Sequence, residues 1–389
     1  MSSVFGRTPE PLMARTASGC WITDALGRHY LDASGGAVVT GIGHGRKEVI
    51  AALTEQLEQL DYVHASAFTS EITEEYCQSI AEIVPVAGAR VYPVSGGSEA
   101  TETVLKMARA YQAAQGRPER SVVVGLDASY HGNTLGALDL SGRPQLRAPY
   151  ESWLGRFRHV PRDIGRLEAE LDRGDVAAFV AEPISGATRA AEVPPADYWP
   201  AVAELCRSRE VLLVVDEVMT GFGRTGRWFG IEHWEVEPDL MICGKGASSG
   251  YWPLGLAIAS GRIYEAIGDD FVHGFTYSHH PAGAAVGMAV LGIIKGEGLV
   301  EAAGRQGALL RSRLEESLGD RVIDIRGKGL LIGIELDADP RSVVAAARAQ
   351  GLLVYPAAIP AIVLGPPLII TDAEIDQLVE RLTVALSET

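Results

Sequence analysis

Short apolar runs rich in β-branched residues recur through the middle of the chain. They cover residues 121–126, 176–181, 211–215, 240–243 and 256–259. These runs are too short for helices and lack polar alternation, which is typical of strands buried on both faces of a mostly parallel sheet. Segments with helical periodicity, such as 99–115 and 198–209, separate several of the runs. The alternation predicts an α/β domain.

The two ends of the chain have a different pattern. Residues up to about 45 mix turns with short runs, and an Ala- and Gly-rich helical stretch follows residue 281 and extends to about 318. A strand pair is predicted at 322–325 and 330–335, a helix near 342–350 and a terminal helix near 372–387. We expect residues 1–45 and 281–389 to form a small α+β domain beside a large domain of residues 46–280.

Length and charge limit the classes of partner. A chain of 389 residues can bury a large core without a disulfide or a structural metal. The net charge of −16 repels phosphate backbones and anionic lipids, so we expect neither nucleic acid nor membrane as a partner.

Cysteine usage and the apolar segments indicate the compartment. Cys20, Cys77, Cys206 and Cys243 are scattered, with no C-x-x-C pair and no His at metal-ligand spacing, which predicts free thiols and no metal site. The N-terminus lacks the apolar stretch of a signal peptide, and four prolines interrupt the most apolar region, 351–370. These features predict a cytoplasmic protein.

Ligands of open α/β sheets bind at the carboxyl ends of strands, so the residues that follow each predicted strand are the first candidates for a site. After the run 90–94 comes Ser-Gly-Gly-Ser, and then a helix begins. Gly97 allows backbone N–H groups to approach an anion, while Ser98 can cap the helix and donate to a phosphate. An ordinary capped helix would give the same pattern.

Tyr130, His131 and Gly132 follow the run 121–126. An aromatic ring near a strand end can stack on a planar ligand, although most Tyr-His pairs are simple packing. His131 is either a base or a loop residue with its hydrogen bonds satisfied, and we favour the second interpretation.

Asp216 directly follows the apolar run 211–215. A carboxylate buried there needs a cation, a hydrogen-bond donor or solvent. A protonated ring nitrogen of a ligand is one such partner, and an ion pair with Arg224 or Arg227 is the structural alternative.

Lys245 is one of only five lysines, and it lies between Gly244 and Gly246 directly after an apolar run. A desolvated ammonium loses its proton more readily, which suits an amine nucleophile for a carbonyl cofactor. A surface lysine would not account for the two glycines.

An anion cradle, an aromatic side chain, a buried carboxylate and an amine nucleophile are together the groups that pyridoxal phosphate needs. A competing pattern, G-x-G-x-x-G at 221–226, is separated from the preceding strand by five residues that include two carboxylates. Because those carboxylates would repel a pyrophosphate, we do not predict a dinucleotide site.

The chain also resembles a known family. The stretch 211–259 is similar to the signature of class III aminotransferases, as are the segments 95–109, 130–134, 181–186, 273–281 and 365–371. The resemblance spans nearly the whole chain and implies a fold type I pyridoxal-phosphate enzyme that works as a homodimer.

The resemblance implies roles for individual residues. Lys245 corresponds to the Schiff-base lysine and proton shuttle, Asp216 to the partner of the pyridine nitrogen, and Val218 and Tyr130 to the residues on the two ring faces. Gly97 and Ser98 would bind the phosphate, and Thr276 would reach the phosphate of the neighbouring subunit. The remaining residues near the cofactor would be His131 and Glu182.

Two departures concern the substrate. Many members of the family have an arginine at the position of Val363, and members of its ornithine and γ-aminobutyrate branches have a glutamate at that of Ala187. Arg162, or its neighbours in sequence Arg143 and Arg147, could bind a substrate carboxylate instead, although we favour a solvated surface role for each of them. Alternatively, one substrate is a neutral amine, which an apolar Val363 would suit.

The sequence therefore predicts transfer of an amino group between a primary amine or ω-amino compound and a keto acid or aldehyde. The alternatives are an epimerase, racemase or aminomutase of the same family and a non-catalytic protein that binds pyridoxal phosphate.

Overall fold

The largest sheet has the strand order β4-β10-β9-β8-β7-β5-β6 in the computed structural model, which describes residues 3–6 and 11–389. Its strands are Arg90–Val94 (β4), Val122–Leu126 (β5), Arg158–Val160 (β6), Val176–Ala181 (β7), Leu212–Asp216 (β8), Leu240–Cys243 (β9) and Gly255–Ala259 (β10). β10 runs antiparallel to the other six strands, which are parallel to one another. The predicted α/β fold with a mostly parallel sheet is confirmed.

Both faces of this sheet are buried. Leu213 and Val215 of β8 belong to one hydrophobic cluster, whereas Leu212 and Val214 belong to another. Successive side chains of a strand point to opposite faces, so β8 is covered on both sides. The continuous apolar runs in the sequence have this cause.

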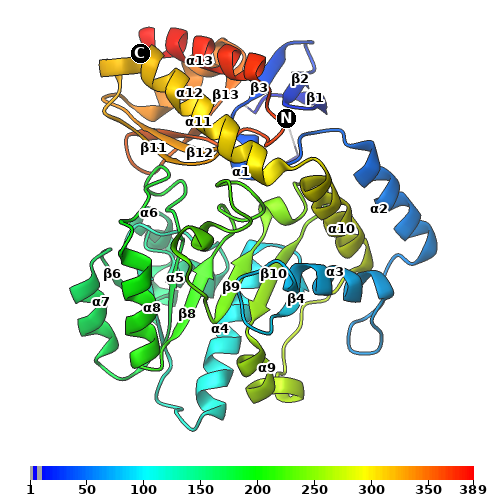
Figure 1. Ribbon diagram of the computed structural model, residues 1–389, viewed down its shortest axis with the longest axis vertical. Coiled ribbons are helices and arrows are strands. Elements are labelled where there is room, and N and C mark those ends of the chain that lie inside the picture. Colours follow the sequence, from blue (N-terminus) through cyan, green and yellow to red (C-terminus); the bar gives the residue numbers. More distant parts are fainter. Residues whose placement is uncertain (1–2, 7–10) are drawn as a thin grey trace.

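Helices cover the two faces of the sheet (Figure 1), with α4 against β9 and β10 and α8 against β8. The helices of this region are Gly35–Val38 (α1), Lys47–Gln59 (α2), Glu71–Ala81 (α3), Gly97–Ala114 (α4), Leu135–Leu140 (α5), Pro144–Arg147 (α6), Ile164–Leu171 (α7), Tyr198–Ser208 (α8), Gly261–Ile267 (α9) and Pro281–Gly296 (α10). Short 3₁₀ helices occur at Ala148–Trp153, Gly230–Trp234, Lys245–Ala247, Gly268–Asp270 and Gly319–Arg321.

The two chain ends meet at the top of Figure 1. One sheet there has the order β1-β2-β3-β13, and β3 pairs in parallel with β13; the other has the order β11-β12-β15-β14. The elements are Ala14–Ser18 (β1), Trp21–Asp24 (β2), His29–Asp32 (β3), Leu299–Leu318 (α11), Asp324–Lys328 (β11), Leu331–Glu335 (β12), Pro340–Ala349 (α12), Leu352–Leu353 (β13), Tyr355–Pro356 (β14), Ala361–Leu364 (β15) and Asp372–Ser387 (α13). The exact domain limits at residues 45 and 280 stay a prediction.

Three local predictions are corrected. The helical stretch after residue 281 is two helices, because Gly298 at φ 61° interrupts it before α11. The strand predicted at 322–325 begins two residues later, at Asp324. Ser98 is not the helix cap: the N-cap of α4 is Gly96, and Ser98 lies in the first turn.

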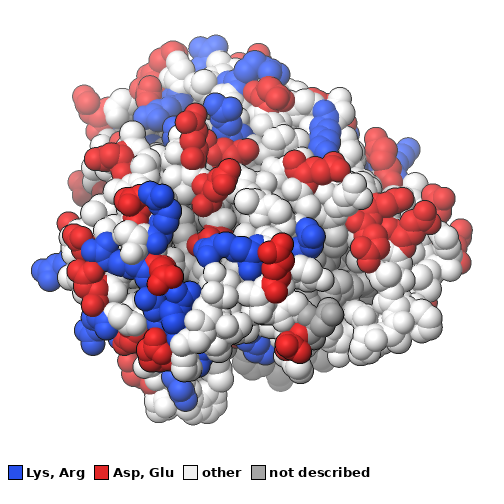
Figure 2. Space-filling view, turned by 60° about the horizontal axis from the view of Figure 1, so that its bottom comes forward, with Lys and Arg blue, Asp and Glu red and all other residues white. Residues whose placement is uncertain are grey.

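The surface is mixed in charge on the face that Figure 2 shows. Acidic and basic side chains are interspersed there, and acidic ones gather toward the right edge, the side on which α2 lies in Figure 1. Within the described residues, no single helix has both the length and the apolar composition to cross a membrane, and the bent pair 281–296 and 299–321 meets these criteria only jointly.

Gly333 of β12 allows the chain-end sheet to approach the segment that follows β7. A Cβ at Gly333 would overlap the carbonyl oxygen of Ala190. We expect Gly333→Ala to lower the free energy of unfolding by about 1–3 kcal/mol. Gly292→Ala is the matched control, because nothing lies within 4 Å of its Cβ on α10, and it should stabilise by about 0.4–1 kcal/mol. Urea unfolding of both variants measures the difference; equal stabilities would contradict the predicted overlap.

Candidate active site

A cavity of about 520 Å³ lies at the carboxyl ends of the parallel strands. Strands β4, β5, β7, β8 and β9 all point to this edge, as the pairing directions require. The structure brings together eight of the predicted site residues in its lining: Gly97, Ser98, Tyr130, His131, Glu182, Asp216, Val218 and Lys245.

Lys245 enters the cavity from the turn after β9. Its φ of 41° lies in the left-handed region, which is uncommon for a residue with a side chain and is found at functional sites. Of the two flanking residues, Gly246 must be a glycine for steric reasons, because a Cβ there would lie 2.9 Å from the Cβ of Phe222. Gly244 is extended and its Cβ would meet only ordinary contacts.

Desolvation lowers the pKa of Lys245 to about 8, and the nearby negative charges of Glu182 and Asp216 oppose this shift. Burial disfavours the charged ammonium because water no longer solvates it. The sequence-based expectation of a lysine that loses its proton readily is in line with this environment. Such an amine can be a nucleophile and can exchange a proton near neutral pH.

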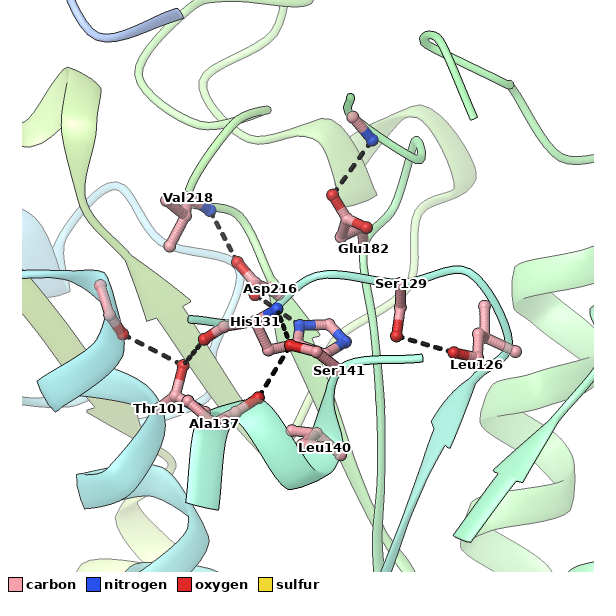
Figure 3. A network of polar contacts seen from close by, with 12 residues as sticks. Thr101, Leu126, Ser129, His131, Ala137, Leu140, Ser141, Glu182, Asp216 and Val218 are labelled. Atoms are coloured by element: carbon pink, nitrogen blue, oxygen red, sulfur yellow. Dashed lines mark hydrogen bonds and ion pairs between the residues drawn. The ribbon is translucent and has the colours of Figure 1, made fainter. Parts of the chain in front are cut away.

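Asp216 is held at the end of β8 by two contacts (Figure 3). Its Oδ2 lies 2.7 Å from Nδ1 of His131, and its Oδ1 accepts a hydrogen bond of 3.0 Å from the backbone N–H of Val218. The ion pair with Arg224 or Arg227 is therefore not formed; the Arg224 guanidinium donates to the carbonyl oxygens of Leu330 and Pro366 instead.

His131 is in turn fixed by its own loop (Figure 3). Its backbone N–H donates to Ser141 Oγ at 2.9 Å, and its carbonyl oxygen accepts from Thr101 Oγ1 at 2.8 Å. Gly132 follows at φ 127°, where a Cβ would overlap the hydroxyl of Ser98. The loop thus aims the imidazole at Asp216. The sequence pattern favours a loop residue with its hydrogen bonds satisfied at His131, and it gives no signal for the contact with Asp216.

Glu182 follows β7 and lies close to this pair (Figure 3). Its Oε1 accepts a hydrogen bond of 3.0 Å from the backbone N–H of Gly186. Burial raises the pKa of Glu182, His131 opposes the shift, and Asp216 adds to it. Two carboxylates at one site favour a proton or a cation between them.

The start of α4 is the segment predicted to hold an anion. The first N–H groups of a helix have no acceptor within the helix, and the helix dipole favours negative charge there. Ser98 Oγ accepts a hydrogen bond of 3.1 Å from the backbone N–H of Asn133, which ties the cradle to the loop of His131.

Three predicted site residues do not line the cavity. Val363 is fully buried in β15, Arg162 bonds Ser185 and lies 3.7 Å from Glu192, and Thr276 is exposed. Other lining residues lie away from the predicted strand ends; among them are Gly36, Ala37, Val39, Arg143 and Tyr355. Four of these come from the chain ends, which only the fold brings to the cavity.

Comparisons with known proteins agree on one family. The sequence profile described as "Aminotransferase class-III" matches residues 4–386. The putrescine–pyruvate aminotransferase of Pseudomonas aeruginosa is 33% identical over 412 residues, which cover 96% of this chain and 90% of that protein. An uncharacterized aminotransferase of Bacillus subtilis is 36% identical, with 93% and 92% covered.

Solved structures show the same fold. An (S)-enantioselective omega-transaminase from Thermomicrobium roseum superposes with a TM-score of 0.95 at 34% identity, covering 100% of this chain and 96% of that chain. The omega transaminase from Pseudomonas jessenii in complex with PMP gives 0.95 at 30% identity, with 100% and 96% covered. These relatives support aminotransfer over the epimerase, racemase or aminomutase alternative. Because the family profile covers the chain from residue 4 to residue 386, the protein belongs to the class III aminotransferases, which use pyridoxal phosphate.

Proposed function

We propose that the cavity is the active site and that Lys245 is the residue that bonds the cofactor covalently, as a Schiff base. The reaction moves an amino group between a primary amine or ω-amino compound and a keto acid or aldehyde. One observation carries the proposal: an amine with a pKa of about 8 shares one cavity with a buried carboxylate. When bound, pyridoxal phosphate supplies an aldehyde that bonds amines and a ring that withdraws electrons from the reacting carbon.

The chemistry of the lining residues fits this cofactor. Gly97 and Ser98 at the start of α4 would hold the phosphate. Asp216 has oxygen lone pairs left after its contacts with His131 and the backbone of Val218, and these can accept from a protonated pyridine nitrogen.

The two ring faces also have candidates. A Cβ at Gly97 would lie 3.3 Å from Val218 Cγ2, so the side chain of Val218 lies directly beside the start of α4. Tyr130, which lines the same cavity, is proposed for the opposite face. Aromatic and aliphatic side chains on two sides would exclude water from the ring.

We assign the proton transfers to Lys245. When Nζ of Lys245 is not bonded to the cofactor, a pKa of about 8, as in the cofactor-free site, would allow this nitrogen both to accept and to donate a proton near neutral pH. The negative charges of Glu182 and Asp216 would stabilise the protonated form of Lys245.

The names of the relatives support the proposed donor class. One relative is named for putrescine and pyruvate, and several solved neighbours are named omega-transaminases. Addition of an ω-amine such as putrescine, with no acceptor, should shift the cofactor absorbance to that of the aminated form and release an aldehyde. Pyruvate should then restore the first band. A product that keeps its amino group while the absorbance is unchanged would contradict transfer.

The pKa of Lys245 predicts how capture of the cofactor depends on pH. Only the neutral amine attacks an aldehyde, and for a pKa of about 8 the neutral fraction rises from about 1% at pH 6 to about 50% at pH 8. The capture rate of cofactor-free protein should therefore rise about 50-fold over this range and level off above about pH 9. Stopped-flow absorbance measures it, with a free lysine derivative as reference for the titration of pyridoxal phosphate itself. A rate still rising at pH 10 would mean an ordinary lysine.

We further propose a homodimer in which Thr276 reaches the neighbouring subunit's phosphate. Thr276 is exposed and lies outside the lining of the cavity in its own chain, and its carbonyl oxygen accepts from Tyr62 Oη at 2.9 Å. Sedimentation of the active enzyme as a monomer would contradict this assembly. We also propose the cytoplasm as the compartment, which the four free cysteines support.

A further inference from the structure

Three arginines were candidates to hold a substrate carboxylate, and the structure separates them. The Arg147 guanidinium donates to the backbone oxygen of Asp139 and lies 3.3 Å from its carboxylate. The Arg162 guanidinium donates to Ser185 Oγ, pairs with Glu192 and lies over the ring of Tyr198. Both cations already have partners within the fold, and neither lines the cavity.

Arg143 differs in both respects. It lines the cavity together with Lys245. Its Nε is buried without a hydrogen-bond partner, and across residues 3–6 and 11–389 no side-chain hydrogen bond or ion pair of Arg143 is formed. A buried donor without a partner is costly, so an acceptor from outside the chain would stabilise it.

The carboxylates of the cavity do not neutralise Arg143. Asp216 is directed at His131 and the Val218 backbone, and Glu182 at the backbone of Gly186. With Lys245 assigned to the cofactor and His131 to Asp216, Arg143 is the remaining cation among the lining residues.

The backbone at Arg143 is held firmly. The preceding residue, Gly142, donates to Ser129 Oγ at 3.2 Å and accepts from the N–H of Ala128 at 2.8 Å. Ser141, one residue earlier, is the side chain that fixes His131 (Figure 3). The loop that positions His131 against Asp216 thus also fixes the backbone from which the Arg143 side chain extends.

We propose that Arg143 binds the carboxylate of a substrate acid in this cavity; the inference rests on the proposed function. A guanidinium offers a planar fork of donors that matches a carboxylate, and it stays charged at every working pH. Because the chain carries a net charge of −16, an acid needs such a local cation to enter. The keto acid acceptor is the substrate that this residue selects, while neutral amines and aldehydes do not need it.

Binding of propionate and of its neutral isostere propionamide to the holoenzyme tests the proposal without turnover. By calorimetry, the wild type should prefer propionate by about 10- to 100-fold. Arg143→Gln should abolish the preference, and Arg143→Lys should retain part of it, since a lysine keeps the charge but not the fork. Arg305→Gln is the matched control: it removes the same charge from an exposed position on α11 and should leave the preference intact.

Turnover gives a second readout. Arg143→Gln should raise the KM for pyruvate by about 10- to 100-fold with kcat nearly unchanged, while the parameters for butanal stay the same. Circular dichroism establishes that each variant is folded, and the lysine variant keeps the comparison possible if the glutamine variant is not.

Three results would overturn the assignment of Arg143: a wild type that binds propionate and propionamide equally, an Arg143→Gln variant that keeps the preference, or loss of the preference in Arg162→Gln instead. Failure of all amine donors in the absorbance experiment would reject the proposed function separately, because the binding comparison does not depend on transfer.

Discussion

Lys245→Ala is expected to abolish covalent capture of pyridoxal phosphate and to lower turnover by about 10³-fold or more, while the chain stays folded. The variant removes the side chain that we propose as both the nucleophile and the group that transfers protons. Borohydride reduction followed by mass spectrometry should find the cofactor on Lys245 in the wild type and nowhere in the variant. Lys47→Ala, at an exposed position at the start of α2, should behave as wild type.

For the same variant we predict a change in how the free energy of unfolding depends on pH. In the cofactor-free protein Lys245 releases its proton near pH 8, compared with 10.5 for an ordinary lysine. Between these values the unfolded chain binds more protons than the folded chain, so Lys245 makes wild-type stability rise with pH in that window. Below about pH 8 the full cost of burying the ammonium remains. Lys245→Ala should therefore gain most over the wild type at pH 7 and least above pH 10.

Thermal unfolding of both cofactor-free proteins at pH 7 and pH 10 measures this difference. A gain that is equal at the two pH values would show that Lys245 titrates normally. Turnover by Lys245→Ala within tenfold of wild type would refute its assigned role.

Asp216→Asn is expected to lower kcat by about 10²- to 10⁴-fold. The amide has nearly the same size and can still accept from the backbone of Val218, but it removes the negative charge proposed to balance the ring nitrogen. It also changes the contact with His131 from a charge-assisted hydrogen bond to a neutral one.

Steady-state kinetics and the cofactor absorbance check this prediction together. Asp216→Glu separates charge from position, because it keeps the carboxylate but displaces it by one methylene. We expect both variants to bind pyridoxal phosphate, with glutamate recovering part of the activity. A fully active asparagine variant would mean that the ring nitrogen has another partner.

The strands of the large sheet and most of the residues that line the cavity could be predicted from the sequence. Strands of a mostly parallel sheet are buried on both faces and appear as apolar runs, and their carboxyl ends meet at one edge. Asp216 and Lys245 each follow such a run, so their meeting in one cavity follows from chain direction alone. The resemblance to class III aminotransferases added the cofactor and the family.

The antiparallel strand β10 and the break at Gly298 were not predictable in the same way. β10 has the same apolar composition as its parallel neighbours, because both faces of it are buried too. A composition that reports burial does not report strand direction.

The sequence by itself determined the strands, the order of the strand-end residues and Lys245 as the candidate nucleophile, because local hydrophobic patterning fixes which residues follow each strand. Only the tertiary structure decided that His131 pairs with Asp216, that the chain ends contribute Gly36 and Tyr355 to the cavity, and that Arg143 rather than Arg162 faces it. These contacts join segments far apart in the chain, and their distances depend on how loops and sheets pack, which no local pattern encodes.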